Sequence, residues 1–111
     1  DHDARQPEQA ARIRQEMIEQ GDGGLRVIAP MIIANARRQL EAGQEVLRTH
    51  ASAVEVDLSQ VAEVDSSALS VLLAWLRTAG ERGISLRIAH PPANLISLAT
   101  LYGVVELLPL A

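Results

Sequence analysis

The segments Val54-Glu55-Val56-Asp57-Leu58-Ser59 and Val64-Asp65-Ser66-Ser67-Ala68-Leu69 decide the fold of this chain. In the first segment apolar and polar residues alternate, which is typical of a strand with one buried face. From Leu69 onward apolar residues recur at helical spacing, with Leu69, Leu72, Leu73 and Leu76 as the predicted inner stripe, which predicts a helix over 66–79. A strand at 54–58 that leads through a polar group into a helix indicates an α/β fold. Sites in such folds tend to lie beyond the carboxyl ends of strands, so the group at 65–67 is either a helix cap or a site.

Composition indicates one globular domain and argues against nucleic acid as a partner. A chain of 111 residues is long enough for one hydrophobic core, and 48% apolar residues suit a folded domain. The chain has no Phe, one Trp and one Tyr, so stacking on nucleic acid bases is not available. The formal net charge of −4 is also unfavourable for binding a phosphate backbone.

Several kinds of chemistry are excluded or disfavoured by the residue types present. There is no Cys, which removes disulfides and thiol nucleophiles, and all ten basic residues are Arg, which removes a phosphate-loop Lys. The lack of Lys also argues against a phospho-accepting receiver domain built on Asp57 and Asp65. No Gly-x-Ser-x-Gly segment supports a hydrolase. His2, His50 and His90 have no metal-ligand spacing, so we expect no metal and no cofactor.

The N-terminal residues differ in character from the rest of the chain. Residues 1–16 are mostly polar, and we interpret them as an N-terminal tail or extension, with the folded domain over 17–111. No apolar run approaches the ~20 residues that span a bilayer, and the first residues lack the apolar core of a signal peptide. We therefore expect a soluble, cytoplasmic protein without direct membrane insertion.

The chain on both sides of the central segment predicts the order β-β-α-β-α-β-α. Residues 13–19 and 25–28 flank a Gly-rich turn at 21–24, which is typical of a β-hairpin. A last strand is predicted at 84–88 from its alternating apolar residues. Because the strands at 54–58 and 84–88 alternate instead of being apolar throughout, we expect the helices to lie mainly on one face of the sheet.

Apolar stripes predict two further helices. The stripe of the first consists of Ile33, Ala36 and Leu40. This helix either ends at Gly43 or continues to Leu47. The stripe of the second consists of Leu95, Leu98, Ala99 and Tyr102. The second helix is bounded by Pro91-Pro92 and Gly103, and the apolar segment 104–110 adds either an edge strand or a last turn.

The polar group and one flank of helix 66–79 each allow two interpretations. Asp65, Ser66 and Ser67 are residue types that cap a helix, but a phosphate on Ser66 or Ser67 would also be stabilised by the positive end of the helix dipole. Val71 and Trp75 lie to one side of the Leu stripe, so they either wrap the rim of the core or offer an apolar flank to a protein. We predict that these five residues form a partner-binding surface with a candidate phosphorylation site.

The same residues resemble a STAS domain, the fold shared by anti-sigma-factor antagonists and the cytoplasmic tails of sulfate transporters. The resemblance is carried by Val56-Asp57-Leu58-Ser59-x-Val61-x-x-Val64-Asp65-Ser66-Ser67-Ala68-Leu69 and by Ser97-Leu98-Ala99-x-Leu101-Tyr102-Gly103-Val104-x-Glu106-Leu107-Leu108-Pro109. The second segment, with Ala68 and Trp75, is most similar to the MlaB-like STAS proteins of phospholipid-transporting ABC complexes. The resemblance covers about residues 17–110 and implies a mixed sheet of about four or five strands with about three or four helices.

The resemblance also implies a function. MlaB-like proteins are non-enzymatic subunits that bind and support the ATPase of an ABC transporter concerned with outer-membrane lipid asymmetry, on the cytoplasmic side of the inner membrane. In relatives of the sigma-factor type the Ser or Thr after the Asp is phosphorylated, and Ser66 occupies that position. The alternative is therefore an anti-sigma-factor antagonist switched at Ser66. Ala68, where those relatives usually have Gly, favours the transporter subunit. A homodimer of the isolated chain and a sensor of a small ligand stay open.

Overall fold

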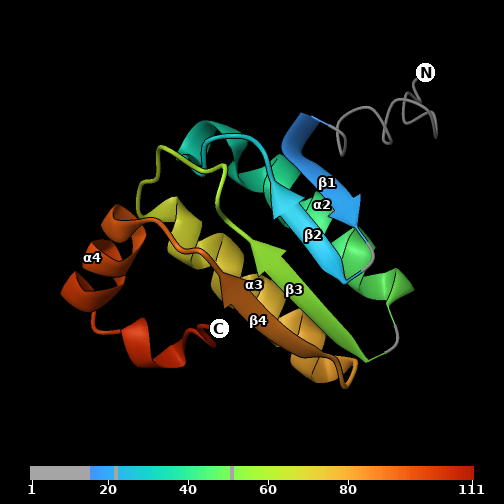
Figure 1. Cartoon of the computed structure of the whole chain (residues 1–111). Helices are drawn as coiled ribbons and strands as arrows, with labels where there is room; N and C mark the ends of the chain where they lie inside the picture. The colour runs from blue at the N-terminus through green and yellow to red at the C-terminus, as the bar shows by residue number, and fades with distance from the viewer. Residues whose placement is uncertain (1–15, 22, 51) are drawn as a thin grey trace.

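The computed structural model of the protein describes residues 16–21, 23–50 and 52–111, in which strands alternate with helices (Figure 1). The elements are β1 (Ile18–Gly21), β2 (Gly24–Val27), η1 (Ile33–Asn35), α2 (Ala36–Thr49), β3 (Ala53–Asp57), α3 (Ser67–Glu81), β4 (Ser85–Ala89), α4 (Ala93–Leu101) and η2 (Val105–Leu107). This order confirms the predicted α/β fold. The predicted tail at residues 1–16 lies outside the described residues, apart from Glu16.

The four strands form one mixed sheet in the order β1-β2-β3-β4. β1 and β2 pair antiparallel as the predicted hairpin, whereas β3 runs parallel to β2 and to β4. At the outer edge of β4, Ile88 and Leu110 form an isolated parallel bridge. The segment 104–110 therefore supplies both a last turn, η2, and a contact along the edge of the sheet.

One face of the sheet is buried and the other carries charge. Val54 and Val56 of β3 are buried, whereas Glu55 between them is exposed and stands opposite exposed Arg87 of β4. Successive side chains of a strand point to opposite sides, so this alternation separates the two faces. In Figure 1, α2 and α3 lie behind the sheet, and no described helix covers its front. The predicted one-sided arrangement of the helices is confirmed.

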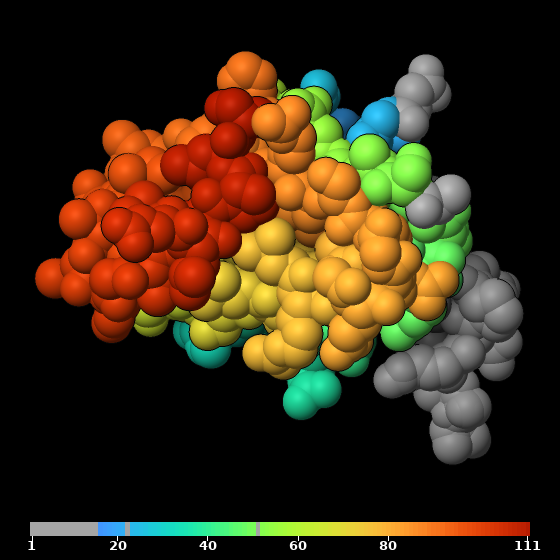
Figure 2. All heavy atoms as spheres, turned by 90° about the horizontal axis from the view of Figure 1, so that it is seen from below, coloured from blue at the N-terminus to red at the C-terminus, as the bar shows by residue number. Residues whose placement is uncertain are grey.

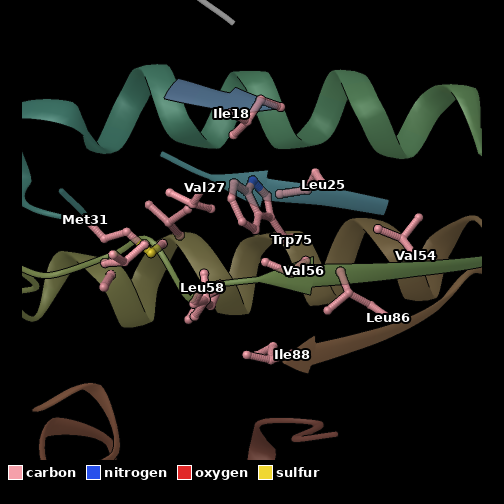
Figure 3. Packing of buried hydrophobic residues seen from close by; sticks show 14 of the residues in the cluster. Ile18, Leu25, Val27, Met31, Val54, Val56, Leu58, Trp75, Leu86 and Ile88 are labelled. Carbon is pink, nitrogen blue, oxygen red and sulfur yellow. The ribbon is translucent and has the colours of Figure 1, made fainter. Parts of the chain in front are cut away.

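The hydrophobic core lies between the sheet and the pair α2 and α3. Figure 3 shows side chains from all four strands converging there, with Trp75 between the two helices. The largest fully buried side chains include Trp75, Ile18, Met31, Leu47 and Leu58. Among the described residues the only buried polar side chain is that of Gln39, which donates from Nε2 to the carbonyl oxygen of Pro30 at 2.8 Å.

Gly43 lies inside α2 and does not end it. A Cβ atom at Gly43 would overlap with atoms of the Trp75 indole. The indole is fully buried against this position, and its Nε1 donates to the carbonyl oxygen of Leu40 at 3.1 Å. The helix runs on to Thr49, so the alternative in which it continues to Leu47 is correct. The glycine is required for close packing of α2 on α3, and not for a helix end.

The hairpin and the stripe of α3 differ in part from the prediction. β1 begins at Ile18, so a strand over 13–19 is wrong for Glu16 and Met17, which have helical backbone, and residues 13–15 lie outside the described part. In α3 the buried residues are Ala68, Leu69, Val71, Leu72, Trp75 and Ala79, whereas Leu73 and Leu76 are half-buried. The buried stripe is rotated because α3 packs on α2 as well as on the sheet.

Candidate functional site

The connection from β3 to α3 lies beside the segment that precedes η1. Met31 and Val64 form an isolated parallel bridge. The Met31 N–H donates to the carbonyl oxygen of Glu63 at 2.9 Å, and the Asp65 N–H donates to the carbonyl oxygen of Met31 at 3.1 Å. Both segments follow the carboxyl ends of parallel strands, where sites tend to lie in this class of fold. The polar group predicted from the sequence is therefore placed next to the start of η1.

The carboxylate of Asp65 joins these two segments. Its Oδ1 accepts the Ser67 N–H at 2.9 Å and also the Ser67 hydroxyl, while its Oδ2 accepts the Ile33 N–H at 2.9 Å. The hydrogen bond from the Ser67 hydroxyl, followed by the one from the Ile33 amide, lowers the pKa of Asp65. An ionised carboxylate whose two oxygens are already occupied by donors holds the backbone in place. It is not arranged to take a proton from a substrate.

The two serines after Asp65 have different environments. Ser67 is half-buried and bound to the Asp65 carboxylate. Ser66 is exposed at the N-cap position of α3, and its hydroxyl makes no hydrogen bond with the residues that the structure describes. The capping acceptor is thus Asp65, and Ser66 is the serine that presents a hydroxyl to solvent at the positive end of the helix.

Val71 and Trp75 do not lie on the surface. Val71 is 4% exposed and Trp75 is 0% exposed, so the predicted apolar flank of α3 for a partner is wrong for these two residues. Helical spacing by itself indicates only the face of α3 that packs on the sheet. α3 also packs against α2, and the Trp75 indole fills the contact between the two helices next to Gly43 and Leu40. Asp65, Ser66 and Ser67 remain as candidates from the predicted set.

Exposed apolar residues occur instead on η1, at the end of α4 and beyond it. The exposed fractions are 74% for Ile33, 75% for Leu101, 58% for Tyr102, 61% for Leu107 and 39% for Leu110. The stripes predicted from the sequence had Ile33 and Tyr102 pointing inward, which is wrong. Tyr102 is the C-cap residue of α4 and is followed by Gly103 with a positive φ, so the helical period no longer applies to it. Gly103 was the signal in the sequence that could have identified Tyr102 as an exposed residue beyond the helical stripe.

The front face of the sheet holds a shallow hollow of about 250 Å³ near the β1–β2 turn. Its charged lining residues are Glu19, Arg26, Glu55 and Asp57. Arg26 forms ion pairs with two of these carboxylates, with Asp57 at 3.1 Å and with Glu19 at 3.6 Å. The single cation of this lining is thus already paired with two of its three carboxylates, so the hollow gives no specific support to a sensor of a small ligand. No group of three His, Asp or Glu residues within the described ranges is arranged to hold a metal ion.

Stability is expected to fall as the pH is lowered below about 4. Burial raises the pKa of Asp57, but hydrogen bonds from Ser59 and Arg26 outweigh it, so the pKa is lowered, as it is for Asp65. Carboxyls with a lowered pKa in the folded state stabilise it above their ordinary pKa, and this contribution is lost as the pH falls through the lowered value.

Denaturant unfolding from about pH 7 to about pH 3, followed by the fluorescence of the single Trp, measures this loss. Asp65→Asn should make the stability less dependent on pH. Glu81→Gln, which replaces an exposed carboxyl at the end of α3, is the control. Equal pH dependence in the Asp65→Asn protein and the original protein would contradict the assigned role of Asp65.

Comparisons with known proteins agree with this architecture. Residues 19–109 match the family model described as "Mlab, STAS domain". A comparison with curated proteins finds no match. Among solved structures, a putative anti-sigma factor antagonist from Thermotoga maritima superposes with a TM-score of 0.71 at 16% sequence identity. The match covers 88% of this chain and 86% of that one, and at this identity it shows the shared fold. Since the family model spans most of its 111 residues, the chain belongs to the MlaB-type STAS domain family.

Proposed function

We propose that this STAS domain is a non-catalytic subunit that binds and supports the ATPase of a phospholipid-transporting ABC transporter. The observation that carries the proposal is the match of residues 19–109 to the MlaB-labelled family model. STAS domains act through protein–protein interaction, and they are generally regulatory and not catalytic. No helix within the described residues is long and apolar enough to cross a bilayer. The proposed place of the chain is the cytoplasmic side of the inner membrane, to which the ATPase holds it.

The proposed docking surface combines the start of α3 with the end of α4. Ser66 supplies a hydroxyl that is not bound within the described chain, while Leu101 and Tyr102 supply exposed apolar area. α3 and α4 are in contact, and Figure 2 shows the segment from α4 to the C-terminus (orange to red) as one end of the molecule beside α3 (yellow). Tyr is enriched among residues that dominate binding, because its ring adds apolar area and its hydroxyl a hydrogen bond. This surface replaces the one predicted with Val71 and Trp75.

Binding through such a surface can support an ATPase without any chemistry in the STAS domain. A subunit that binds one conformation of its partner more tightly raises the population of that conformation. It also stabilises the folded partner by mass action. The part of this chain proposed to bind is its folded domain, residues 17–111.

Changes on this surface are expected to separate the chain from the ATPase. Tyr102→Asp and Ser66→Asp should each weaken binding by about tenfold or more, since each places a charge in a desolvated contact. Affinity-tag co-purification with the ATPase subunit, followed by calorimetric titration of the purified pair, measures the effect. Ser85→Asp, on an exposed position of β4, is the control. Full binding by both Tyr102→Asp and Ser66→Asp proteins would rule this surface out.

The second candidate is an anti-sigma-factor antagonist switched by phosphorylation of Ser66. It is favoured by the fold shared with the putative anti-sigma factor antagonist and by the exposure of Ser66. Ala68 disfavours it, because Gly is usual there in that type. Incubation with anti-sigma kinases and measurement of intact mass separates the two functions. Added phosphate that is lost in Ser66→Ala would support the antagonist.

A further inference from the structure

We infer that Ile33 and Arg37, at the junction of η1 and α2, form a second contact of the docking surface. This contact fits an apolar pocket of the ATPase that is bordered by a carboxylate. This inference rests on the proposed function and names a further part of the same surface. Ile33 is 74% exposed, although Ile is among the residue types most often buried. Arg37 follows four residues later, with a side chain that is 87% exposed. A partner that covers both would remove apolar surface from water and pair a charge.

The exposed Ile33 is held in a fixed position. Its N–H donates to Oδ2 of Asp65 at 2.9 Å, and Asp65 directly precedes Ser66. Asn35 donates from Nδ2 to the carbonyl oxygen of Pro30 at 2.9 Å, which closes the turn. The buried Gln39 donates to the same oxygen at 2.8 Å and fixes the turn to α2. Because this backbone is already ordered, the chain itself loses little conformational entropy when a partner covers Ile33.

Charge indicates what borders the partner's pocket. Arg38 is engaged within its own turn, since its guanidinium donates to Oδ1 of Asn35 at 2.9 Å and to the carbonyl oxygen of Ala34 at 3.3 Å. Arg37 has only a loose pairing with Glu41 at 3.7 Å, and both side chains are largely exposed. Exposed pairs of this kind contribute little, about 0–1 kcal/mol. Arg37 is therefore available to a carboxylate of the partner, whereas Arg38 is not.

Asp65 connects this contact to Ser66. One carboxylate binds the Ile33 amide of η1 and the Ser67 amide of α3, so the two halves of the surface keep a constant relative position. Asp65 is accordingly a positioning residue, which acts on binding through Ile33. Its effect on affinity should therefore depend on whether the Ile33 side chain is present.

The test is calorimetric titration of the purified chain with the purified ATPase subunit. Ile33→Ser should weaken binding by about tenfold or more, as expected for an apolar anchor. Arg37→Glu should weaken it as well, by an amount that shrinks as the salt concentration rises. Leu110→Ser and Arg87→Glu are matched controls, an exposed apolar residue beside β4 and an exposed arginine on the front face of the sheet, and both should bind nearly as the original chain does.

A double-mutant cycle tests the role of Asp65. Asp65→Asn alone should weaken binding, and in the Ile33→Ser background it should weaken binding by a smaller factor. Fluorescence unfolding of each variant identifies the fraction that is folded, and Ser67→Ala, which removes one donor to Asp65, replaces Asp65→Asn if that variant is unfolded. A purely structural role for Asp65 would lower affinity equally in both backgrounds.

The outcomes separate this inference from the proposed function. If Tyr102→Asp abolishes binding while Ile33→Ser and Arg37→Glu bind as the original chain does, the second contact is absent and the proposed function stands. If Leu110→Ser weakens binding as much as Ile33→Ser does, the effect is not specific to η1 and the inference fails. If the original chain does not bind the ATPase at all, the proposed function and the inference both fall.

Discussion

Alanine at Gly43 is expected to lower the free energy of unfolding by about 1–3 kcal/mol, the usual range for overpacking a filled core. Replacing a helical glycine with alanine normally stabilises a protein by about 0.5–1 kcal/mol, so the expected sign is reversed. The reason is that a Cβ at Gly43 would overlap with the indole of Trp75, which is fully buried and bound through Nε1 to Leu40. Either α2 and α3 move apart or the indole leaves its site, and both reduce contacts in the core.

Denaturant unfolding followed by circular dichroism measures this change. Gly80→Ala is the matched control, because Gly80 is also inside a helix but a Cβ there meets no atom within 4 Å beyond its chain neighbours and the nearby backbone of its own helix. That variant should gain about 0.4–1 kcal/mol. A Gly43→Ala protein as stable as the Gly80→Ala protein would mean that α2 and α3 are not in close contact at Trp75.

Trp75→Ala is expected to have the largest effect, a loss of about 3–5 kcal/mol in the free energy of unfolding. Trp75 is the largest of the fully buried side chains, and its removal leaves a cavity between α2, α3 and the sheet (Figure 3). The substitution also removes the donor to the Leu40 carbonyl oxygen. Because small domains have only about 5–15 kcal/mol of stability, we expect this variant to be partly unfolded at physiological temperature.

The measurement is thermal and denaturant unfolding by circular dichroism, with Trp75→Phe as the graded control that keeps a smaller aromatic ring and loses the donor. Trp75→Phe should be intermediate between the original protein and Trp75→Ala. In a double mutant, Gly43→Ala should cost less when Trp75 is already Ala, because the indole that it overlaps with is gone. If the Trp75→Ala protein keeps its stability but no longer binds the ATPase, Trp75 belongs to the binding surface.

The elements of the fold follow closely from local patterns in the sequence. The alternation at 54–58 and at 84–88 corresponds to β3 and β4, and the helical spacing after Ser66 corresponds to α3. The Gly-rich turn at 21–24 joins β1 to β2. Each of these patterns reflects the side-chain period of its own segment, which neighbouring segments do not alter.

The candidate site was predicted in part, because it depends on which neighbours each side chain meets. Asp65 is well suited to cap α3, and its local hydrogen bonds to Ser67 are formed as residue type suggests. Its bond to Ile33 joins residues 32 positions apart, which no local pattern indicates. Ile33 and Trp75 are both apolar residues at helical spacing, yet one is 74% exposed and the other is 0% exposed.

The sequence by itself determined the order of strands and helices, the mixed α/β class, the polar start of α3 and the family. Those properties depend on periodicity and residue type within short segments. Only the tertiary structure decided that Gly43 accommodates Trp75, that Ser66 and not Ser67 presents its hydroxyl to solvent, and that Ile33 and Tyr102 face outward. The physical reason is that burial depends on how α2, α3 and the sheet pack together, and this packing joins residues far apart in the chain.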